Sequence, residues 1–288
     1  RSVGVTGVQT CALPILDMTA VNLLQLRKEI NALMWNFTDP DAFEKTLLEL
    51  FEKYRTARNP AGTAILLTAH SAELNVPLIV LRELEIALFQ TVADHPDAAL
   101  QLSDRMMTTG APEIRTIGAR ILGLAPIGYS NDVFQRIEAW SRMGFDTGEL
   151  RVFIRSAGSL VRQADSERLL DQARSWVLSN EKKDQELGVE TLIFLIEFDG
   201  FQNLPVVFSL LEKLLRTGPT TMQPELLELT TKLLDRSPIE TSYTIRLILE
   251  SETPGVMTPR IARKLLTEFT EPSRAAIQKL LRLQSGRA

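Results

Sequence analysis

The sequence of 288 residues has few of the residue types that support covalent or metal-centred chemistry. It contains one cysteine, Cys11, and two histidines, His70 and His95. One cysteine excludes a disulfide within the chain, and neither histidine has thiols or carboxylates at metal-ligand spacing. Glycine-rich phosphate loops, nucleophile elbows and zinc-protease helix motifs are absent as well. We therefore expect no metal site and no cofactor.

Aromatic residues, long apolar runs and an excess of basic residues are also lacking. Aromatics make up 6% of the chain, and the net charge is −4. No apolar run approaches the roughly 18 residues that cross a membrane, and the N-terminal residues show no signal-peptide cleavage pattern. Proteins that bind duplex DNA usually carry a basic surplus. We expect a cytoplasmic monomer that does not associate with membranes.

Apolar residues at helical spacing fill the sequence from Thr19 onward. The segment VNLLQLRKEINALMW (21–35) places Leu23, Leu26, Ile30, Leu33 and Met34 on one stripe, and DAFEKTLLELFEKY (41–54) does so with Phe43, Leu47, Leu50, Phe51 and Tyr54. Spacing of three and four residues is typical of amphipathic helices. No segment shows the sustained alternation of a strand, so the sequence predicts an all-α fold.

Proline, glycine, asparagine and aspartate interrupt these helical patterns at regular intervals. Asp39, Ser237 and Thr258 stand beside prolines where a new helix is expected to begin. The interruptions predict about fifteen helices of about 11–18 residues, joined by short loops.

An internal repeat is visible around two tryptophans. Segments DVFQRIEAWSRMG and RLLDQARSWVLSN align Trp140 with Trp176, which are 36 residues apart, and the helices expected at 149–161 and 184–196 also correspond. Repeated helix pairs that cannot bury their apolar faces alone form solenoids by stacking. The sequence predicts an α-solenoid of antiparallel helix pairs, HEAT-like, of about 35–40 residues each. An all-α bundle without a repeat is the alternative.

Three segments resemble the HEAT-like DNA alkylation repair family. They are APEIRTIGARILGLAP (111–126), residues 137–196 and the C-terminal residues 224–281. Together with the repeated helix spacing between these segments, the resemblance extends over about two-thirds of the chain. The resemblance implies a solenoid with a concave, DNA-binding face. Members that excise alkylated bases use an aspartate near the sugar, aromatic side chains around the base and a nearby arginine.

The resemblance assigns these roles to particular positions. Asp146 would be the catalytic aspartate, with Trp140 or Trp176 against the base. Arg142, however, stands where a further tryptophan is expected. Gln185 and Glu186 stand where the arginine is expected, so two of three family features are absent.

The same residues have simpler interpretations. Asp146 is a good helix N-cap, and the matching positions of Trp140 and Trp176 favour core packing. Arg151 and Arg155, at i,i+4 spacing, form either a phosphate-facing stripe or a solvated helix face.

These observations favour a non-catalytic helical-repeat scaffold or binding module that uses its concave face. The expected partner is a protein or DNA. The alternative is a DNA glycosylase, or a damaged-DNA-binding protein, that acts on alkylated bases through Asp146, with Trp140, Arg142, Arg151, Arg155 and Trp176 as binding residues.

The first sixteen residues differ from everything after them. Residues 5–15, VTGVQTCALPI, resemble the in-frame translation of a short-read sequencing adapter, and they contain Cys11. We interpret residues 1–16 as a non-native N-terminal segment and residues 17–288 as a single HEAT-like domain.

Overall fold

The computed structural model describes residues 21–55, 76–109 and 111–285, and these ranges contain helices but no strand. The all-α prediction is therefore confirmed for this part of the chain. The interpretation of residues 1–16, Cys11 included, falls outside these ranges, as does His70.

Fourteen α-helices lie within the described ranges. The first seven are α1 (Leu23–Met34), α2 (Pro40–Tyr54), α3 (Leu78–Asp94), α4 (Pro96–Met107), α5 (Pro112–Gly123), α6 (Ser130–Ser141) and α7 (Thr147–Ala164). The others are α8 (Ser166–Val177), α9 (Lys182–Ile196), α10 (Leu204–Thr217), α11 (Gln223–Arg236), α12 (Pro238–Glu250), α13 (Met257–Lys264) and α14 (Glu271–Ser285).

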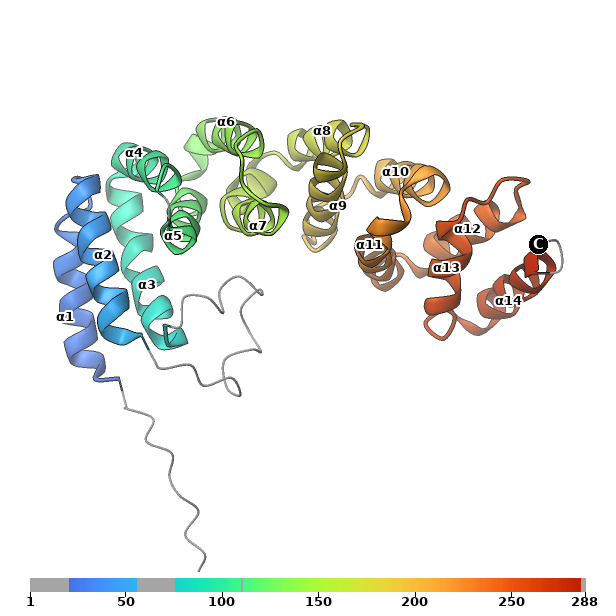
Figure 1. Ribbon diagram of the computed structural model, residues 1–288, viewed down its shortest axis with the longest axis horizontal. Helices are drawn as coiled ribbons and strands as arrows, with labels where there is room; N and C mark the ends of the chain where they lie inside the picture. The colour runs from blue at the N-terminus through green and yellow to red at the C-terminus, as the bar shows by residue number, and fades with distance from the viewer. Residues whose placement is uncertain (1–20, 56–75, 110, 286–288) are drawn as a thin grey trace, which may run out of the picture.

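The helices form a bowed row (Figure 1). Helices α4, α6, α8 and α10 lie along its outer side, and we call them the outer row. Helices α5, α7, α9 and α11 lie along the inner side of the bow, and the surface that they carry there is called the inner face. Contacts join α5 to α7, α7 to α9 and α9 to α11, so the inner face is continuous.

Local sequence explains where many helices begin. Asp39 accepts a hydrogen bond from the Ala42 amide at 3.1 Å and caps α2, while Asp165 accepts one from the Arg168 amide at 3.1 Å and caps α8. Such side chains satisfy amide groups that the first helical turn leaves without partners. The predicted start at Asp39 is confirmed.

The predicted apolar stripes also form the core. Leu26, Ile30 and Leu33 of α1 are fully buried, although Leu23 of the same predicted stripe is 42% exposed. The reason is its position as the first residue of the helix, where less of the molecule covers it.

The start predicted at Thr258 is wrong. Helix α13 begins at Met257, has only eight residues, and buries Thr258, whose Oγ1 donates to the Leu215 carbonyl at 3.3 Å. Packing against the end of α10 therefore uses a hydroxyl that the sequence suggested for a cap.

Two glycines set how closely the helices approach. A Cβ atom at Gly123, the last residue of α5, would lie 2.0 Å from the Ser156 carbonyl oxygen of α7. A Cβ at Gly188 of α9 would lie 2.8 Å from the Val177 amide nitrogen of α8. Both contacts are with backbone, so the helices pack at a separation that only glycine permits.

Candidate functional site

Helix α7 lies at the centre of the inner face. It packs against α5 and α9 on its two sides and against α6 and α8 behind. Its buried residues are apolar, and the side left uncovered by these neighbours carries Arg151, Arg155, Ser156, Ser159 and Arg162. The predicted arginine stripe is thus a feature of the inner face.

Arg155 is held by two carboxylates of α9 and its C-terminal end. Its Nε donates to Glu190 at 2.6 Å, and its Nη1 donates to Glu197 at 2.9 Å. The Glu190 side chain is only 6% exposed, in the middle of α9. Burial opposes the charge on Arg155, but the two carboxylates outweigh it and raise the pKa of Arg155 above its ordinary value.

Three more cations of the inner face are paired with carboxylates. Arg151 Nη2 donates to Glu225 of α11 at 3.0 Å, and Arg115 Nε of α5 donates to Glu149 of α7 at 2.9 Å. Lys232 of α11 lies 3.1 Å from Glu197. We call these eight residues the inner charge network: Arg115, Arg151, Arg155, Lys232, Glu149, Glu190, Glu197 and Glu225.

The network holds Glu197 in its ionised form. Burial raises the pKa of this carboxyl group. Hydrogen bonds and charges from Lys232 and Arg155 lower the pKa by more than burial raises it, so the pKa lies below its ordinary value. The inner charge network thus pairs four basic side chains with four acidic ones.

Arg162 is bound differently. Its Nη1 donates to the Phe194 carbonyl at 2.6 Å, and its guanidinium lies over the Phe194 ring, 3.8 Å from the centroid. The pKa of Arg162 lies below its ordinary value, chiefly because burial disfavours the charged guanidinium. The carboxylate of Glu197 opposes this effect only in part, and repulsion from Arg155 adds to it. This side chain ties α7 to the end of α9.

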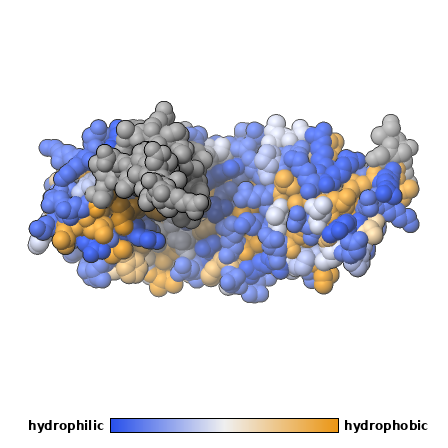
Figure 2. Space-filling model, turned by 90° about the horizontal axis from the view of Figure 1, so that it is seen from below, coloured by the Kyte–Doolittle hydropathy of each residue, from blue (hydrophilic) through white to orange (hydrophobic). Residues whose placement is uncertain are grey.

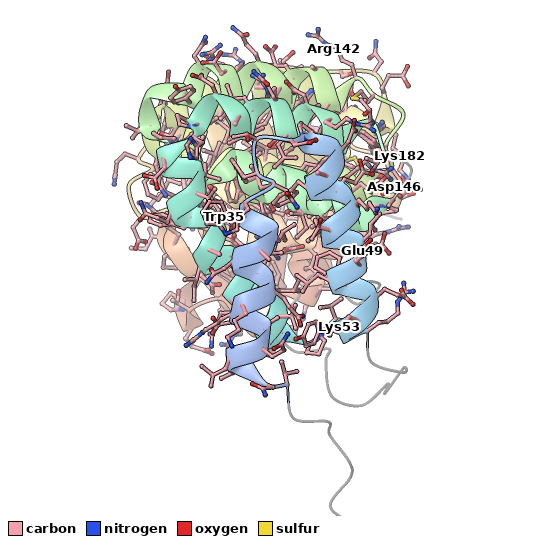
Figure 3. The ribbon with its side chains drawn as sticks, turned by 90° about the vertical axis from the view of Figure 1, so that its left-hand side faces the viewer. Trp35, Glu49, Lys53, Arg142, Asp146 and Lys182 are labelled. Carbon is pink, nitrogen blue, oxygen red and sulfur yellow. The ribbon has the colours of Figure 1, made fainter. Side chains whose placement is uncertain are left out.

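The structure places Asp146 at the start of α7. Its Oδ1 accepts a hydrogen bond from the Glu149 amide at 2.8 Å, so the N-cap interpretation is confirmed. The side chain is exposed at the edge of the molecule, and Lys182 lies on the same edge (Figure 3).

The two predicted tryptophans lie in the core. Trp140 is 4% exposed and Trp176 is 6% exposed. Trp140 packs edge to face against Phe153 of α7, with ring centroids 5.8 Å apart. The core interpretation is confirmed for both, and neither presents a ring face to a groove.

Arg142 does not join the other predicted residues. Its side chain is 78% exposed at the end of α6 and lies 3.8 Å from Glu138. Figure 3 shows it at the top, on the side of the outer row, whereas Arg151 and Arg155 belong to the inner face. The six predicted site residues are therefore spread over four parts of the molecule: the edge, the core, the side of the outer row and the inner face.

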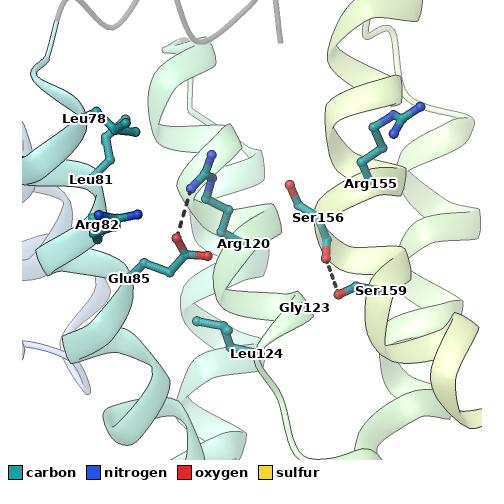
Figure 4. A pocket seen from close by; sticks show the side chains of 10 residues that line it. All are labelled: Leu78, Leu81, Arg82, Glu85, Arg120, Gly123, Leu124, Arg155, Ser156 and Ser159. Atoms are coloured by element: carbon teal, nitrogen blue, oxygen red, sulfur yellow. Dashed lines mark hydrogen bonds and ion pairs between the residues drawn. The ribbon is translucent and has the colours of Figure 1, made fainter. Parts of the chain in front are cut away.

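A groove of about 500 Å³ opens between α3, α5 and α7 (Figure 4). Arg82, Glu85 and Arg120 line one part of it, and Ser156 and Ser159 line another. Arg120 Nη1 lies 3.7 Å from Glu85, and Ser159 Oγ donates to the Ser156 carbonyl at 2.9 Å. The groove has two cations besides Arg155, and it is suited to polar or anionic groups.

Sequence reasoning missed Glu190, Glu225 and the residues of this groove other than Arg155. Glu190 left one signal, because it is the single charged residue in the run LGVETLIFLI (187–196). An acidic residue inside an apolar helix needs a buried partner.

Figure 2, seen from below, shows the described surface with hydrophilic residues across its middle and apolar ones interspersed.

Comparisons with known proteins add no family assignment. No protein-family model, curated protein or solved structure matches the chain. Within residues 21–55, 76–109 and 111–285, no three His, Cys, Asp or Glu side chains are grouped to hold a metal ion. Over the same ranges, no helix combines the length and apolarity that a membrane crossing requires.

Asp146→Ala is expected to lower the free energy of unfolding by about 1 kcal/mol, because a first-turn amide of α7 loses its acceptor. Asp146→Asn retains an acceptor oxygen and should lose much less. Urea denaturation of both variants checks this, with Asp171→Ala in the exposed middle of α8 as the control. Equal losses for the alanine and asparagine variants would contradict the capping role.

Proposed function

We propose that the chain is a HEAT-like α-solenoid that binds a protein partner on its inner face and catalyses no reaction. Helix spacing supports the repeat. The outer-row helices and α12 begin at Pro96, Ser130, Ser166, Leu204 and Pro238, so successive starts differ by 34 to 38 residues. Inner helices α5, α7 and α9 begin 35 residues apart.

Polar contacts between helices show the same period. In the outer row, Arg136 pairs with Asp104 across 32 residues, and Arg168 donates to Asn131 across 37. On the inner face, Arg155 pairs with Glu190 across 35 residues. Contacts between equivalent places of neighbouring units are what a stacked repeat produces.

The observation that carries the function is the balance of the inner charge network. Every cation in it already has a carboxylate partner within 3.1 Å. Duplex binding depends on cations that are free to replace counterions at phosphates. A surface of satisfied, alternating charges instead suits a polar protein surface, where complementary charges give specificity.

The alternative, a DNA glycosylase, has less support. It requires a carboxylate and an aromatic wall at one cleft, whereas Asp146 caps a helix at the edge and Trp140 and Trp176 are buried. The arginines that would contact phosphate, Arg151 and Arg155, are paired.

The distinguishing experiment measures duplex binding against salt, with plain duplexes and duplexes that contain an alkylated purine. The wild-type chain is expected to show no salt-dependent binding and no base release. Glu190→Gln combined with Glu197→Gln releases Arg155 and should create salt-dependent binding. Glu49→Gln with Asp171→Asn changes the net charge equally at two exposed positions elsewhere and should not.

Release of alkylated bases by the wild-type chain would refute the proposal and support the glycosylase.

The positive test is capture of a protein partner that depends on the inner face. Glu228→Arg with Asp235→Arg, both exposed on α11, should abolish capture, whereas Asp171→Arg on the outer row should leave it intact.

A further inference from the structure

Helix α12 carries an apolar stripe that no described part of the chain covers. Ile239, Tyr243 and Leu247 follow one another at i, i+4 and i+8 and are 77%, 55% and 43% exposed. The opposite side of α12 is buried and includes Ile245, Ile248 and Leu249. A helix with large apolar residues on both sides is typical of one that is covered on both sides.

The outer-row helices provide an internal comparison. Helix α12 packs beside α10 and follows it at the C-terminal end of the molecule (Figure 1). The residue that corresponds to Tyr243, counted from each helix start, is polar and exposed in all four outer-row helices: Gln101, Gln135, Asp171 and Ser209. The apolar stripe is therefore specific to α12, and contiguous exposed apolar groups mark interaction surfaces.

Charges flank this stripe asymmetrically. With about 100° between successive residues, Glu240 lies about 60° to one side of the stripe and Arg246 about 60° to the other. Glu240 accepts a hydrogen bond from Ser237 Oγ at 2.6 Å, which lowers the pKa of its carboxyl group. Arg246 forms an ion pair with Glu250, with its Nε 3.4 Å from that carboxylate, and its guanidinium lies over the Tyr243 ring, 5.8 Å from the centroid.

This asymmetry indicates the partner and its orientation. When two α12 helices lie parallel about a two-fold axis, Glu240 of each copy flanks the same side of the contact as Arg246 of the other. In an antiparallel pair, Glu240 would meet Glu240 and Arg246 would meet Arg246. A second copy in the parallel arrangement thus supplies both the apolar surface and the complementary charges.

We propose that the chain forms a weak homodimer in which two α12 helices pack in parallel, with Ile239, Tyr243 and Leu247 at the contact. This replaces the monomer expected from the sequence. Three side chains per copy cover less than the roughly 800 Å² per partner of stable interfaces, so the dimer dissociates on dilution.

Sedimentation velocity from about 10 µM to about 1 mM tests the proposal, since small interfaces give dissociation constants in or near this range. The wild-type chain should shift from monomer to dimer. Tyr243→Ser should raise the dissociation constant at least about tenfold, because the side chain is lost from both copies. Gln135→Ser, at the corresponding place on α6, is the control and should have no effect.

Charge exchange tests the orientation. Arg246→Glu and Glu240→Arg should each weaken the dimer, and the double variant Glu240→Arg/Arg246→Glu should restore it. Circular dichroism verifies that α12 remains folded, since Glu240 also binds Ser237. A chain that stays monomeric throughout, a dimer insensitive to Tyr243→Ser, or single exchanges that the double variant fails to rescue would each overturn the proposal. A monomer that captures a different protein through Tyr243 would overturn it as well.

Discussion

Trp176→Ala is expected to lower the free energy of unfolding by about 3–5 kcal/mol, and Trp140→Ala should cost a similar amount. Both side chains are buried, at 6% and 4% exposure, and both lie eleven positions into a twelve-residue outer-row helix. Truncation leaves a cavity that the surrounding helices can fill only in part. Chemical denaturation of the two variants measures the loss.

The third tryptophan is the matched control. Trp35 is 87% exposed, and Trp35→Ala should change stability by less than about 0.5 kcal/mol. A small loss at Trp176 together with a loss of binding to alkylated DNA would show that its ring contacts a base. A large loss of stability at both buried positions instead supports a packing role for both rings in the core.

Gly123→Ala is expected to destabilise the fold by about 2–3 kcal/mol, although alanine is intrinsically the better helix former. The new Cβ would lie 2.0 Å from the Ser156 carbonyl oxygen, and backbone cannot move aside as a flexible side chain can. Relief requires α5 and α7 to separate, which disturbs the contacts of both inner helices. Thermal or chemical denaturation gives the sign of the change directly.

Gly144→Ala provides the comparison, because a Cβ at this loop position would meet no atom within 4 Å. Its stability should stay close to that of the wild-type chain. If Gly123→Ala were stabilising by the amount that helix propensity suggests, α5 and α7 could not pack as closely as described.

The inner charge network links stability to binding. Glu190 and Arg155 are partners because α7 and α9 lie side by side. Since each side chain is paired with the other, neither is free to contact a ligand. Breaking a largely buried pair from one side leaves the remaining charge without compensation. Substitutions in this network will therefore affect folding and recognition together, which is why the partner-capture test uses exposed residues of α11.

Much of the helical architecture could be predicted from local patterns. Asp39 and Asp165 mark helix starts by their own hydrogen bonds, and Leu26, Ile30 and Leu33 mark a buried face by their spacing. Both signals act within one or two helical turns, so they are present in short stretches of sequence. The capping role of Asp146 and the burial of the two tryptophans followed from the same kind of evidence.

Pairing between helices could not be predicted in this way. Arg155 meets Glu190 across 35 residues, and Thr258 binds a carbonyl 43 residues earlier. Ile239, Tyr243 and Leu247 have the same periodicity as a buried stripe, yet they are exposed. Periodicity shows which residues share a helix face, and packing alone decides what that face contacts, because such contacts depend on the distances and orientations of neighbouring helices.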